Sequence, residues 1–275
     1  MIKKINIVIT VKKKTNNLKN LLISISNQTV LPFEVIISTC EKFSLKKMNF
    51  DLKIIKSPIQ NQVYQRQLAI KNFKKKNNIL LQLDERCVLD KNAIKYLQIK
   101  WSESKNTYYG IGLNAHNNLD RGVLDKITNF LNLKGKILKV GINTGYQNIQ
   151  KDIEVDWLSG GSSSWKIDKN FLNSKKNLFL KNDWSVGEDI IQSLNKPKGK
   201  KIIVCYKAKA TFTERSTKQL NQINFFERGK SSIIFRKELS KLQNCNFFIF
   251  YLFNLPLILT SLLYNLIFFN SKKLK

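Results

Sequence analysis

Histidine and cysteine are scarce in this chain: its 275 residues include one histidine, His116, and four cysteines. The cysteines stand far apart, at positions 40, 87, 205 and 245, and no Cys-x-x-Cys pair occurs. Because a zinc site needs clustered Cys and His ligands, the sequence predicts no zinc centre. Widely separated cysteines in a chain of this length are typical of reduced, cytosolic proteins. A catalytic Cys–His pair stays open, although nothing in the sequence places His116 beside a cysteine.

Acidic residues are also few, with 19 Asp and Glu against 48 Lys and Arg, and the formal net charge is +29. A chain this basic can bind nucleic acid or an anionic membrane leaflet. Lysine far outnumbers arginine and is scattered with asparagine and isoleucine along the whole chain, a pattern typical of an A+T-rich genome. No aromatic–basic recognition signature stands out. We therefore expect attraction to a membrane surface and no nucleic-acid partner.

Apolar runs and helical patterns alternate through the first half of the chain. The first run, residues 5–11, is too short for a signal peptide and predicts a strand buried on both faces. Further strands are predicted at residues 33–37, 52–55 and 79–83, and helices at 16–28, at 62–73 and after Asp90, the expected cap of that third helix. This alternation predicts an α/β fold with a mostly parallel sheet and helices on both faces.

The middle of the chain is less regular but contains no flexible linker. Strands are expected at residues 109–113, 137–142 and 201–205, and a helix is expected within 184–194. Residues 1–215 are therefore predicted to form one domain, which a basic helical extension, residues 216–245, follows.

The last part of the chain holds a long apolar run, residues 247–269, of a length that fits a membrane helix. Asn254, Pro256 and Asn265 interrupt it, and basic residues flank it on both sides. We expect residues 246–275 to associate with a membrane, as a span, a hairpin or an in-plane helix. A buried helix of a soluble core is the alternative.

Three short motifs carry the residue types of a catalytic site. Asp84-Glu85-Arg86 follows the strand 79–83, at the edge where open α/β sheets bind ligands, and its acids can hold a cation or simply cap the loop. Glu188-Asp189 is expected at a helix start, where acids are favoured by the helix dipole or serve as a general base. In the third motif, Trp157 can stack on a sugar or pack in the core, and the following Gly160-Gly161 lets a ligand approach the backbone.

The order and spacing of these motifs resemble those of the family 2 glycosyltransferases. The resemblance runs from about residue 5 to about residue 212. It comprises an opening strand and helix that end in Gln28-Thr29, a helix with Gln65-Arg66, and the segments ILLQLDERCVLD, VDWLSGGSSSWK and VGEDIIQSL.

The resemblance implies a GT-A type fold, in which a Rossmann-like sheet binds a nucleotide-sugar, and transfer of the sugar with inversion to an acceptor hydroxyl. It implies that Asp189, with Glu188 beside it, is the catalytic base. The implied donor-binding residues are Val11, Lys12, Arg66, Asp84, Glu85 and Arg86, and the implied acceptor-binding residues are Asp156, Trp157, Gly160 and Gly161. Mg²⁺ or Mn²⁺, held by Asp84 and Glu85, is the implied cofactor.

The chain departs from the family pattern at three places. Arg86 stands where the family's acidic loop has a second aspartate. No histidine lies near Phe212-Thr213, and Thr39-Cys40 replaces an acidic pair that commonly reads the base. Two hypotheses follow: either Arg86 pairs with the diphosphate in place of part of the cation, or Asp84 and Glu85 still hold a metal.

We therefore expect a transferase that acts on a glycan or lipid-linked acceptor at the cytoplasmic face of a bacterial-type inner or plasma membrane. The alternatives are a polyprenyl-phosphate glycosyltransferase, whose acceptor is a lipid phosphate, and a non-catalytic protein that binds a sugar nucleotide or a glycan on the same fold.

Overall fold

The computed structural model describes residues 4–74, 79–104, 106–117, 131, 133–146, 149–167, 187–213, 225–255 and 259. The chain divides into two compact units. The first contains residues 1–135 and 145–214, and the second contains residues 136–144 and 215–275.

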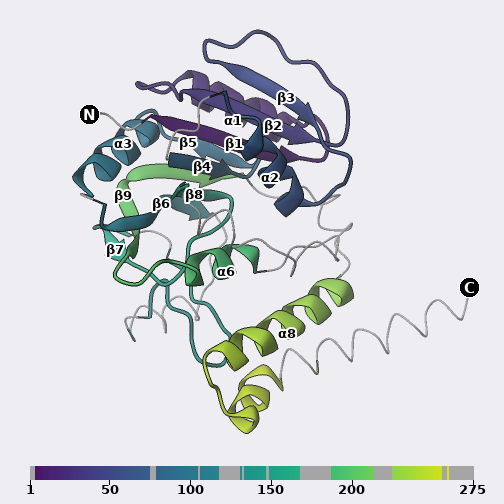
Figure 1. Ribbon diagram of the computed structural model, residues 1–275, viewed down its shortest axis with the longest axis vertical. Coiled ribbons are helices and arrows are strands. Elements are labelled where there is room, and N and C mark those ends of the chain that lie inside the picture. Colours follow the sequence, from purple (N-terminus) through teal and green to yellow (C-terminus); the bar gives the residue numbers. More distant parts are fainter. Residues whose placement is uncertain are drawn as a thin grey trace, which may run out of the picture. The chain divides into compact units, whose positions relative to one another are not determined.

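The first unit is built on one sheet with the strand order β3-β2-β1-β4-β8-β6-β9-β5, and β7 pairs with β9 (Figure 1). The strands are β1 (Ile5–Val11), β2 (Glu34–Thr39), β3 (Leu52–Lys56), β4 (Ile79–Leu83), β5 (Cys87–Leu89), β6 (Tyr108–Asn117), β7 (Ile153–Glu154), β8 (Ser162–Lys166) and β9 (Lys201–Phe212). The helices of this unit are α1 (Asn16–Ser26), α2 (Gln62–Lys71), α3 (Ala93–Glu103) and α6 (Glu188–Leu194).

The sheet is parallel in one half and mixed in the other. The strands β3, β2, β1 and β4 are parallel neighbours, as predicted. The prediction of a mostly parallel sheet is wrong for the rest, because β8 runs antiparallel to both β4 and β6, and β5 and β7 run antiparallel to β9. The register pairs Ser162 with Leu83, so β8 begins beside the end of β4. This reversal brings the turn before β8 to the rim where the parallel strands end.

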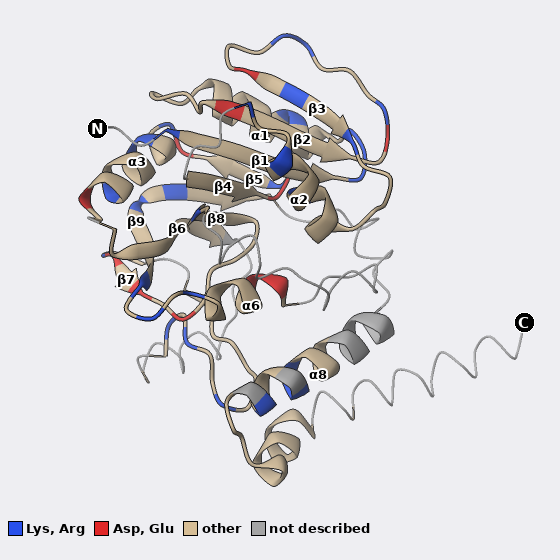
Figure 2. Ribbon diagram, viewed as in Figure 1, with Lys and Arg blue, Asp and Glu red and all other residues tan. Residues whose placement is uncertain are grey.

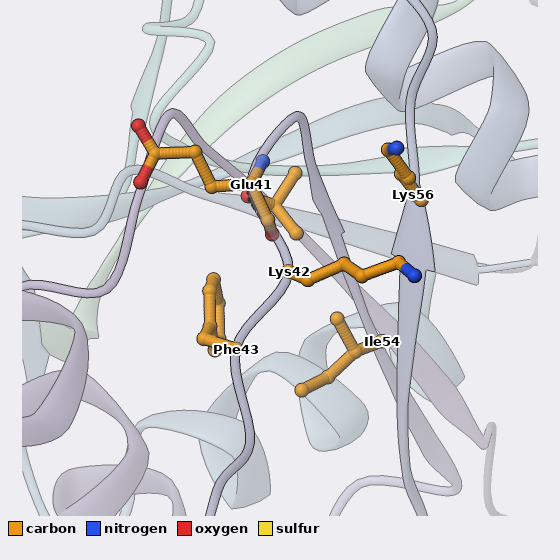
Figure 3. A pocket seen from close by; sticks show the side chains of 6 residues that line it. Glu41, Lys42, Phe43, Ile54 and Lys56 are labelled. Atoms are coloured by element: carbon orange, nitrogen blue, oxygen red, sulfur yellow. Dashed lines mark hydrogen bonds between the residues drawn. The ribbon is translucent and has the colours of Figure 1, made fainter.

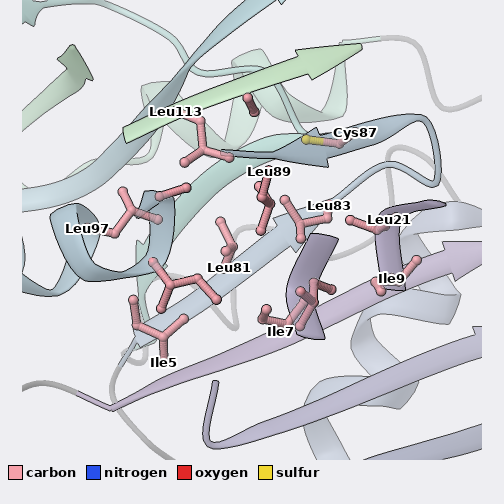
Figure 4. Close-up of a cluster of buried hydrophobic side chains, with 14 of the residues drawn as sticks. Ile5, Ile7, Ile9, Leu21, Leu81, Leu83, Cys87, Leu89, Leu97 and Leu113 are labelled. Atoms are coloured by element: carbon pink, nitrogen blue, oxygen red, sulfur yellow. The ribbon is translucent and has the colours of Figure 1, made fainter. Parts of the chain in front are cut away.

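Two buried clusters occupy the two faces of the sheet. Figure 4 shows the cluster that contains Ile5, Ile7 and Ile9. Along β1, Ile5, Ile7 and Ile9 join the cluster that also contains side chains of α1 and α3, whereas Val8 joins the cluster that contains Ala69 of α2. Successive strand residues point to opposite faces, so a strand covered on both sides needs an unbroken apolar run. The predicted helices on both faces are therefore confirmed.

The helix starts follow local capping rules only in part. Of the two residues that could cap α1, Thr15 and Asn16, the structure has Thr15 as the cap, which accepts a hydrogen bond from the Leu18 N–H at 3.1 Å. Asp90 does not cap α3 with its side chain. The N-cap of α3 is Asn92, and Asp90 contributes only its carbonyl oxygen, which accepts from the Ala93 N–H at 2.9 Å.

Two strand assignments need correction. Residues 137–142 form no strand, and only an isolated bridge joins Ile137 to Asn143. Conversely, the serine-rich segment before Trp165 is the strand β8, which no apolar pattern indicates. Its Ser164 hydroxyl accepts from the Trp101 indole N–H at 2.9 Å and donates to the Ile111 carbonyl at 2.7 Å. The Ser163 hydroxyl accepts from the Trp165 indole N–H at 2.9 Å, so two of the three buried serines have hydrogen-bond partners inside this central strand.

The second unit contains α8 (Phe225–Leu242) and a helical stretch at residues 247–255. Asn254, expected as an interruption of the apolar run, is fully buried. Its amide donates to the carbonyls of Val140 (3.1 Å) and Phe250 (2.9 Å), and its oxygen accepts from Arg236 (3.0 Å). This asparagine therefore fixes the packing inside the unit.

The predicted membrane segment, residues 246–275, is only partly covered by the structure. Across the residues that the structure describes, no helix combines the length and the apolar character that a membrane span needs. Residues 256–258 and 260–275 lie outside the described part, as do residues 214–224 of the expected basic extension. Residues 168–186, which include the expected start of the helix within 184–194, also lie outside it.

Candidate active site

The carboxyl ends of β3, β2, β1 and β4 form one rim of the sheet, and Gln65 of α2 holds two of them together. Its side-chain amide donates to the carbonyl of Val11 at 3.1 Å and to that of Ser38 at 3.0 Å. The Thr39 hydroxyl donates to the Lys12 carbonyl at 3.1 Å. Open α/β sheets bind their ligands beyond such ends, so α2 is anchored where a ligand is expected.

Gly160-Gly161 lies between the two acidic motifs. The Asp84 N–H donates to the Gly161 carbonyl at 2.9 Å, and a Cβ on Gly161 would come within 2.7 Å of the Asp84 Cβ. The Gly160 N–H donates to Asp189 Oδ2 at 3.2 Å. A Cβ on Gly160 would meet Arg66 Nη1 at 3.2 Å and the Asp189 Cβ at 3.4 Å. Paired glycines therefore let Asp84 and Asp189 approach the same turn from two sides.

An ion pair between Arg66 and Glu188 joins α2 to α6. The side chains are 5% and 9% exposed, so the pair is almost completely removed from water. Glu188 and Asp189 are the first residues of α6, and they form the acidic start of this helix in Figure 2. Gly187 precedes them with a φ of 80°, a backbone conformation that glycine adopts without strain. The pair therefore fixes the start of α6, and with it the position of Asp189.

The environment of Asp189 raises its pKa to about 6. Burial is the main cause, and the negative charge of Glu188 adds to it. Hydrogen bonds from the N–H groups of Gly160 and Ile190, and the charge of Arg66, act in the opposite direction. A carboxylate that titrates near neutral pH suits the role of a general base. The residue is half-buried, so it is not sealed from solvent.

The loop Asp84-Glu85-Arg86 does not present free carboxylates. Both oxygens of Asp84 accept from Arg86: Oδ1 from the backbone N–H (2.9 Å) and from Nε (3.1 Å), and Oδ2 from Nη2 (3.3 Å). Glu85 Oε2 accepts from the Thr15 hydroxyl at 2.8 Å, and burial raises the pKa of Glu85. The described ranges contain no group of three Asp, Glu, His or Cys side chains that suits a metal ion. These residues therefore do not fit the implied Mg²⁺ or Mn²⁺ site.

The end of β9 lies against this loop. The Thr213 N–H donates to the Arg86 carbonyl at 2.9 Å, and the Arg86 guanidinium lies 5.8 Å from the centre of the Phe212 ring. Phe212-Thr213 is the place where the sequence lacks the expected histidine. Two of the three departures from the family pattern, Arg86 and the missing histidine near Phe212-Thr213, are therefore neighbours in space.

The segment before Gly160-Gly161 is held by packing. The Trp157 ring meets the Tyr146 ring edge to face, with centroids 5.3 Å apart. The N–H of Leu158 donates to the Ser193 hydroxyl of α6 at 3.1 Å, and the Asp156 N–H donates to the Gly135 carbonyl at 2.8 Å. Trp157 is only half-buried. Its packing against Tyr146 and its partial exposure are compatible both with a core role and with stacking on a sugar.

A cavity of about 380 Å³ lies at the β2–β3 end of the rim. It is lined by Thr39, Glu41, Lys42, Phe43, Ile54 and Lys56. In Figure 3 the Lys42 side chain extends toward the strand that carries Ile54, whereas Glu41 points away from that strand. Residues 41–43 belong to no motif of the sequence, and their place shortly after the end of β2 is the signal that points to them.

Comparison with known proteins supports the architecture. No protein-family model and no curated protein matches the sequence. Solved structures do match. One is GalNAc-T7 with UDP, GalNAc and Mn²⁺, with a TM-score of 0.54 and 14% identity over 78% of this chain. Another is residues 1–349 of S. aureus TarS in complex with UDP-GlcNAc, with a TM-score of 0.53 and 12% identity over 84% of this chain.

The fold is that of the GT-A type glycosyltransferases. The chain spans 44% of the GalNAc-T7 chain and 66% of the TarS chain, so it covers less than two thirds of either. At these identities the likeness establishes the fold alone, and the narrower resemblance to family 2 stays a prediction. The activity has to be argued from the residues of the rim.

Proposed function

We propose that this protein transfers a sugar from a nucleotide-sugar donor to a hydroxyl group of a glycan or lipid-linked acceptor, with inversion, and that Asp189 is the general base. The observation that carries the proposal is the Gly160-Gly161 turn, which has Asp84 against one glycine and Asp189 against the other. A donor bound along the rim beyond Asp84 would therefore present its sugar to Asp189.

A donor would follow the rim of the sheet. The cavity beside Phe43 and Ile54 has room for a nucleobase, and Thr39, which lines it, donates to the carbonyl of Lys12, the residue after β1. Lys12 is exposed, and the next strand along the rim is β4, which Asp84 follows. The donor would extend from the cavity past β1 to the turn of paired glycines. This direction places its anomeric carbon at the α6 end of the track.

The proposed reaction is a single displacement. The Asp189 carboxylate takes the proton of the acceptor hydroxyl, and the hydroxyl oxygen forms a bond to the anomeric carbon. The bond from that carbon to the diphosphate breaks on the opposite face, and its electron pair leaves with the nucleoside diphosphate. Arg66 and Glu188 act indirectly, because their ion pair holds the start of α6. On the acceptor side, Trp157 and Asp156 belong to the same segment as the glycines, which supports a role for them in acceptor binding.

Turnover of a panel of UDP-, GDP-, dTDP- and CMP-sugars across pH 5 to 8 tests this proposal. We expect release of one nucleotide product, with a kcat/KM that rises through pH ~6 to a plateau, because Asp189 must lose its proton to act as a base. The panel is read with and without a glycan acceptor, since water can replace the acceptor slowly. No turnover of any donor, or a rate that does not change from pH 5 to 8, would count against Asp189 as the base.

Loss of the Asp189 proton, which is expected to raise the activity, is expected to lower the stability of the folded protein. The pKa of Asp189 is raised from 3.8 to about 6, so the folded protein binds this proton more tightly than the unfolded chain does. Its contribution to stability is therefore complete below pH ~4 and is lost as the pH rises through ~6. Activity and this part of stability should change in opposite directions over one pH interval.

We also propose that the second unit binds an anionic lipid surface, at the cytoplasmic face of a bacterial-type inner or plasma membrane. The helical stretch 247–255 exposes large apolar side chains: Phe247 (70%), Phe248 (73%), Leu252 (58%) and Phe253 (58%). In α8, Lys241 is exposed and Lys237 is half-buried. Aromatic side chains next to lysines, in a chain of net charge +29, suit the interface of a negatively charged bilayer.

Co-sedimentation with vesicles tests the membrane proposal. We expect the wild type to bind vesicles with 30 mol% phosphatidylglycerol, and the combined change Phe247→Ser and Phe248→Ser to weaken this binding by about tenfold or more, since each buried phenylalanine contributes ~1.5–3 kcal/mol. Ile23→Ser is the matched control, because Ile23 is a similarly exposed apolar residue (45%) on α1. Equal binding by the double variant and the wild type, or no binding to anionic vesicles, would contradict the proposal.

A further inference from the structure

The acidic loop after β4 contains a positive charge of its own, the guanidinium of Arg86. Arg86 donates to both oxygens of the Asp84 carboxylate, through Nε at 3.1 Å and Nη2 at 3.3 Å. Its backbone N–H donates to the same carboxylate at 2.9 Å, so a tight local turn fixes the pair. A divalent cation on Asp84 would have to displace this guanidinium or lie beside it against electrostatic repulsion. The position that would hold a metal is therefore already positively charged.

The rest of the loop supplies no replacement ligands. Glu85 is engaged with the Thr15 hydroxyl, which also caps α1. Cys87 is completely buried and packs in the apolar cluster on one face of the sheet. His116 is paired in register with Thr211, between strands β6 and β9. In the part of the chain that the structure describes, these residues do not assemble three metal ligands around Asp84.

The guanidinium is supported from a second side. It lies over the Phe212 ring at 5.8 Å, and the Thr213 N–H donates to the Arg86 carbonyl at 2.9 Å. Such contacts hold both the charge and the backbone of the residue in place. The arginine side chain is nevertheless 21% exposed, so its outer N–H groups are accessible to a ligand. Arginine has five N–H donors, and Asp84 accepts from two of its side-chain nitrogens.

The geometry points to Arg86 as the cation that binds the diphosphate of the donor, so that nucleoside diphosphates bind this protein without a divalent metal. This inference rests on the proposed function, because it concerns the same donor. A planar guanidinium offers parallel N–H groups that match two phosphate oxygens, whereas Asp84 alone would repel them. Asp84 then orients the arginine and is not a metal ligand. The positive charge needed by the departing diphosphate comes from the chain itself.

Titration calorimetry of the full chain with UDP, GDP and dTDP, in EDTA and in Mn²⁺, tests the inference. For the wild type we expect one diphosphate to bind with an affinity that EDTA does not change. In EDTA, Arg86→Asp should weaken this binding by about tenfold or more, the amount expected for losing hydrogen bonds to a charged group. Because this variant has two carboxylates around Glu85, Mn²⁺ should restore much of its affinity. Arg86→Lys, which keeps the charge without the fork, should bind between the two.

Lys95→Asp is the control, since it makes the same charge change at an exposed position of α3. It should bind as the wild type does, and thermal melts should show that all variants are folded. Should Arg86→Asp fail to fold, Arg86→Gln in EDTA provides the same comparison. Metal-dependent binding by the wild type, or EDTA binding that the Arg86 variants do not weaken, would overturn the role of Arg86 alone. Failure of every diphosphate to bind would instead overturn the proposed function, and this inference with it.

Discussion

Replacing Asp189 with asparagine is expected to lower the transfer rate by about 10²- to 10⁴-fold, while the affinity for the nucleoside diphosphate stays within about twofold of wild type. The amide keeps the size of the carboxylate but cannot accept a proton from the acceptor hydroxyl. Its oxygen can still accept from the Gly160 N–H, which donates to Asp189 at 3.2 Å, so the turn should remain in place. The residual rate should also lose the rise through pH ~6, because the group that titrates there is gone.

Asp51→Asn provides the matched control, because it makes the same chemical change in an exposed carboxylate that pairs with Lys74 at the surface. The control should keep the wild-type rate. The outcome also separates two acceptor classes. A lipid phosphate needs little base catalysis, so a decrease smaller than about tenfold would favour a polyprenyl-phosphate acceptor over a hydroxyl. A wild-type transfer rate in the Asp189→Asn variant with a glycan acceptor would show that Asp189 is not the general base.

Replacing Arg66 with methionine is expected to destabilise the first unit by about 3–5 kcal/mol, because the change leaves Glu188 as a buried, unpaired charge. The exposure of the Glu188 side chain is only 9%, and its Oε2 already has no hydrogen-bond partner among the described residues. Methionine keeps much of the arginine volume, so the decrease in the free energy of unfolding should come from the unpaired charge of Glu188 and not from a cavity. Urea unfolding, followed by circular dichroism, measures the difference.

The double variant Arg66→Met with Glu188→Gln distinguishes an ion pair from a packing effect. Removing both charges should recover most of the lost stability, because a buried pair replaced as a whole costs little. The pH profile should respond as well: the charge of Arg66 lowers the pKa of Asp189 and that of Glu188 raises it. The single Arg66 variant should therefore shift the acid limb above pH ~6, and the double variant should bring it back. A single variant as stable as the wild type would contradict the ion pair.

The first half of the fold follows from local sequence patterns. The strands β1 and β4 are largely apolar, and they begin and end where the apolar pattern predicts. The helix α1 begins at the predicted residue, Asn16, and it buries Leu18 and Ile25. These features are readable because burial on both faces requires continuous apolar residues, and helix starts require a capping side chain.

The second half depends on contacts that are distant in sequence. The strand β8 contains three buried serines, and Trp101, 63 residues before Ser164, hydrogen-bonds to the hydroxyl of that serine. No local pattern predicts that, and the same return of the chain brings Gly160-Gly161 beside Asp84. The Arg66–Glu188 pair joins residues 122 positions apart. The sequence therefore reveals the acidic motifs but not the ion pairs in which their carboxylates take part. For this reason the sequence led to the expectation that Asp84 and Glu85 hold a metal, whereas the Asp84 carboxylate pairs with Arg86.

The dipeptide Gln28-Thr29, which is part of the resemblance to family 2, has a structural role. The Gln28 amide donates to the carbonyls of Ser24 and Asp90, and its oxygen accepts from the Ile94 N–H. Thr29 donates its hydroxyl to Asn92 at 2.8 Å. The dipeptide therefore ties the end of α1 to the start of α3, which accounts for its presence without any contact to the rim.

The most direct test of the proposed reaction is a crystal structure of the Asp189→Asn variant with the intact nucleotide-sugar that binds most tightly. We expect the nucleobase in the cavity beside Phe43, the diphosphate against Arg86, and the anomeric carbon facing position 189, with space for one hydroxyl between them. A donor bound away from the rim, or one whose anomeric carbon points away from position 189, would contradict the proposed reaction.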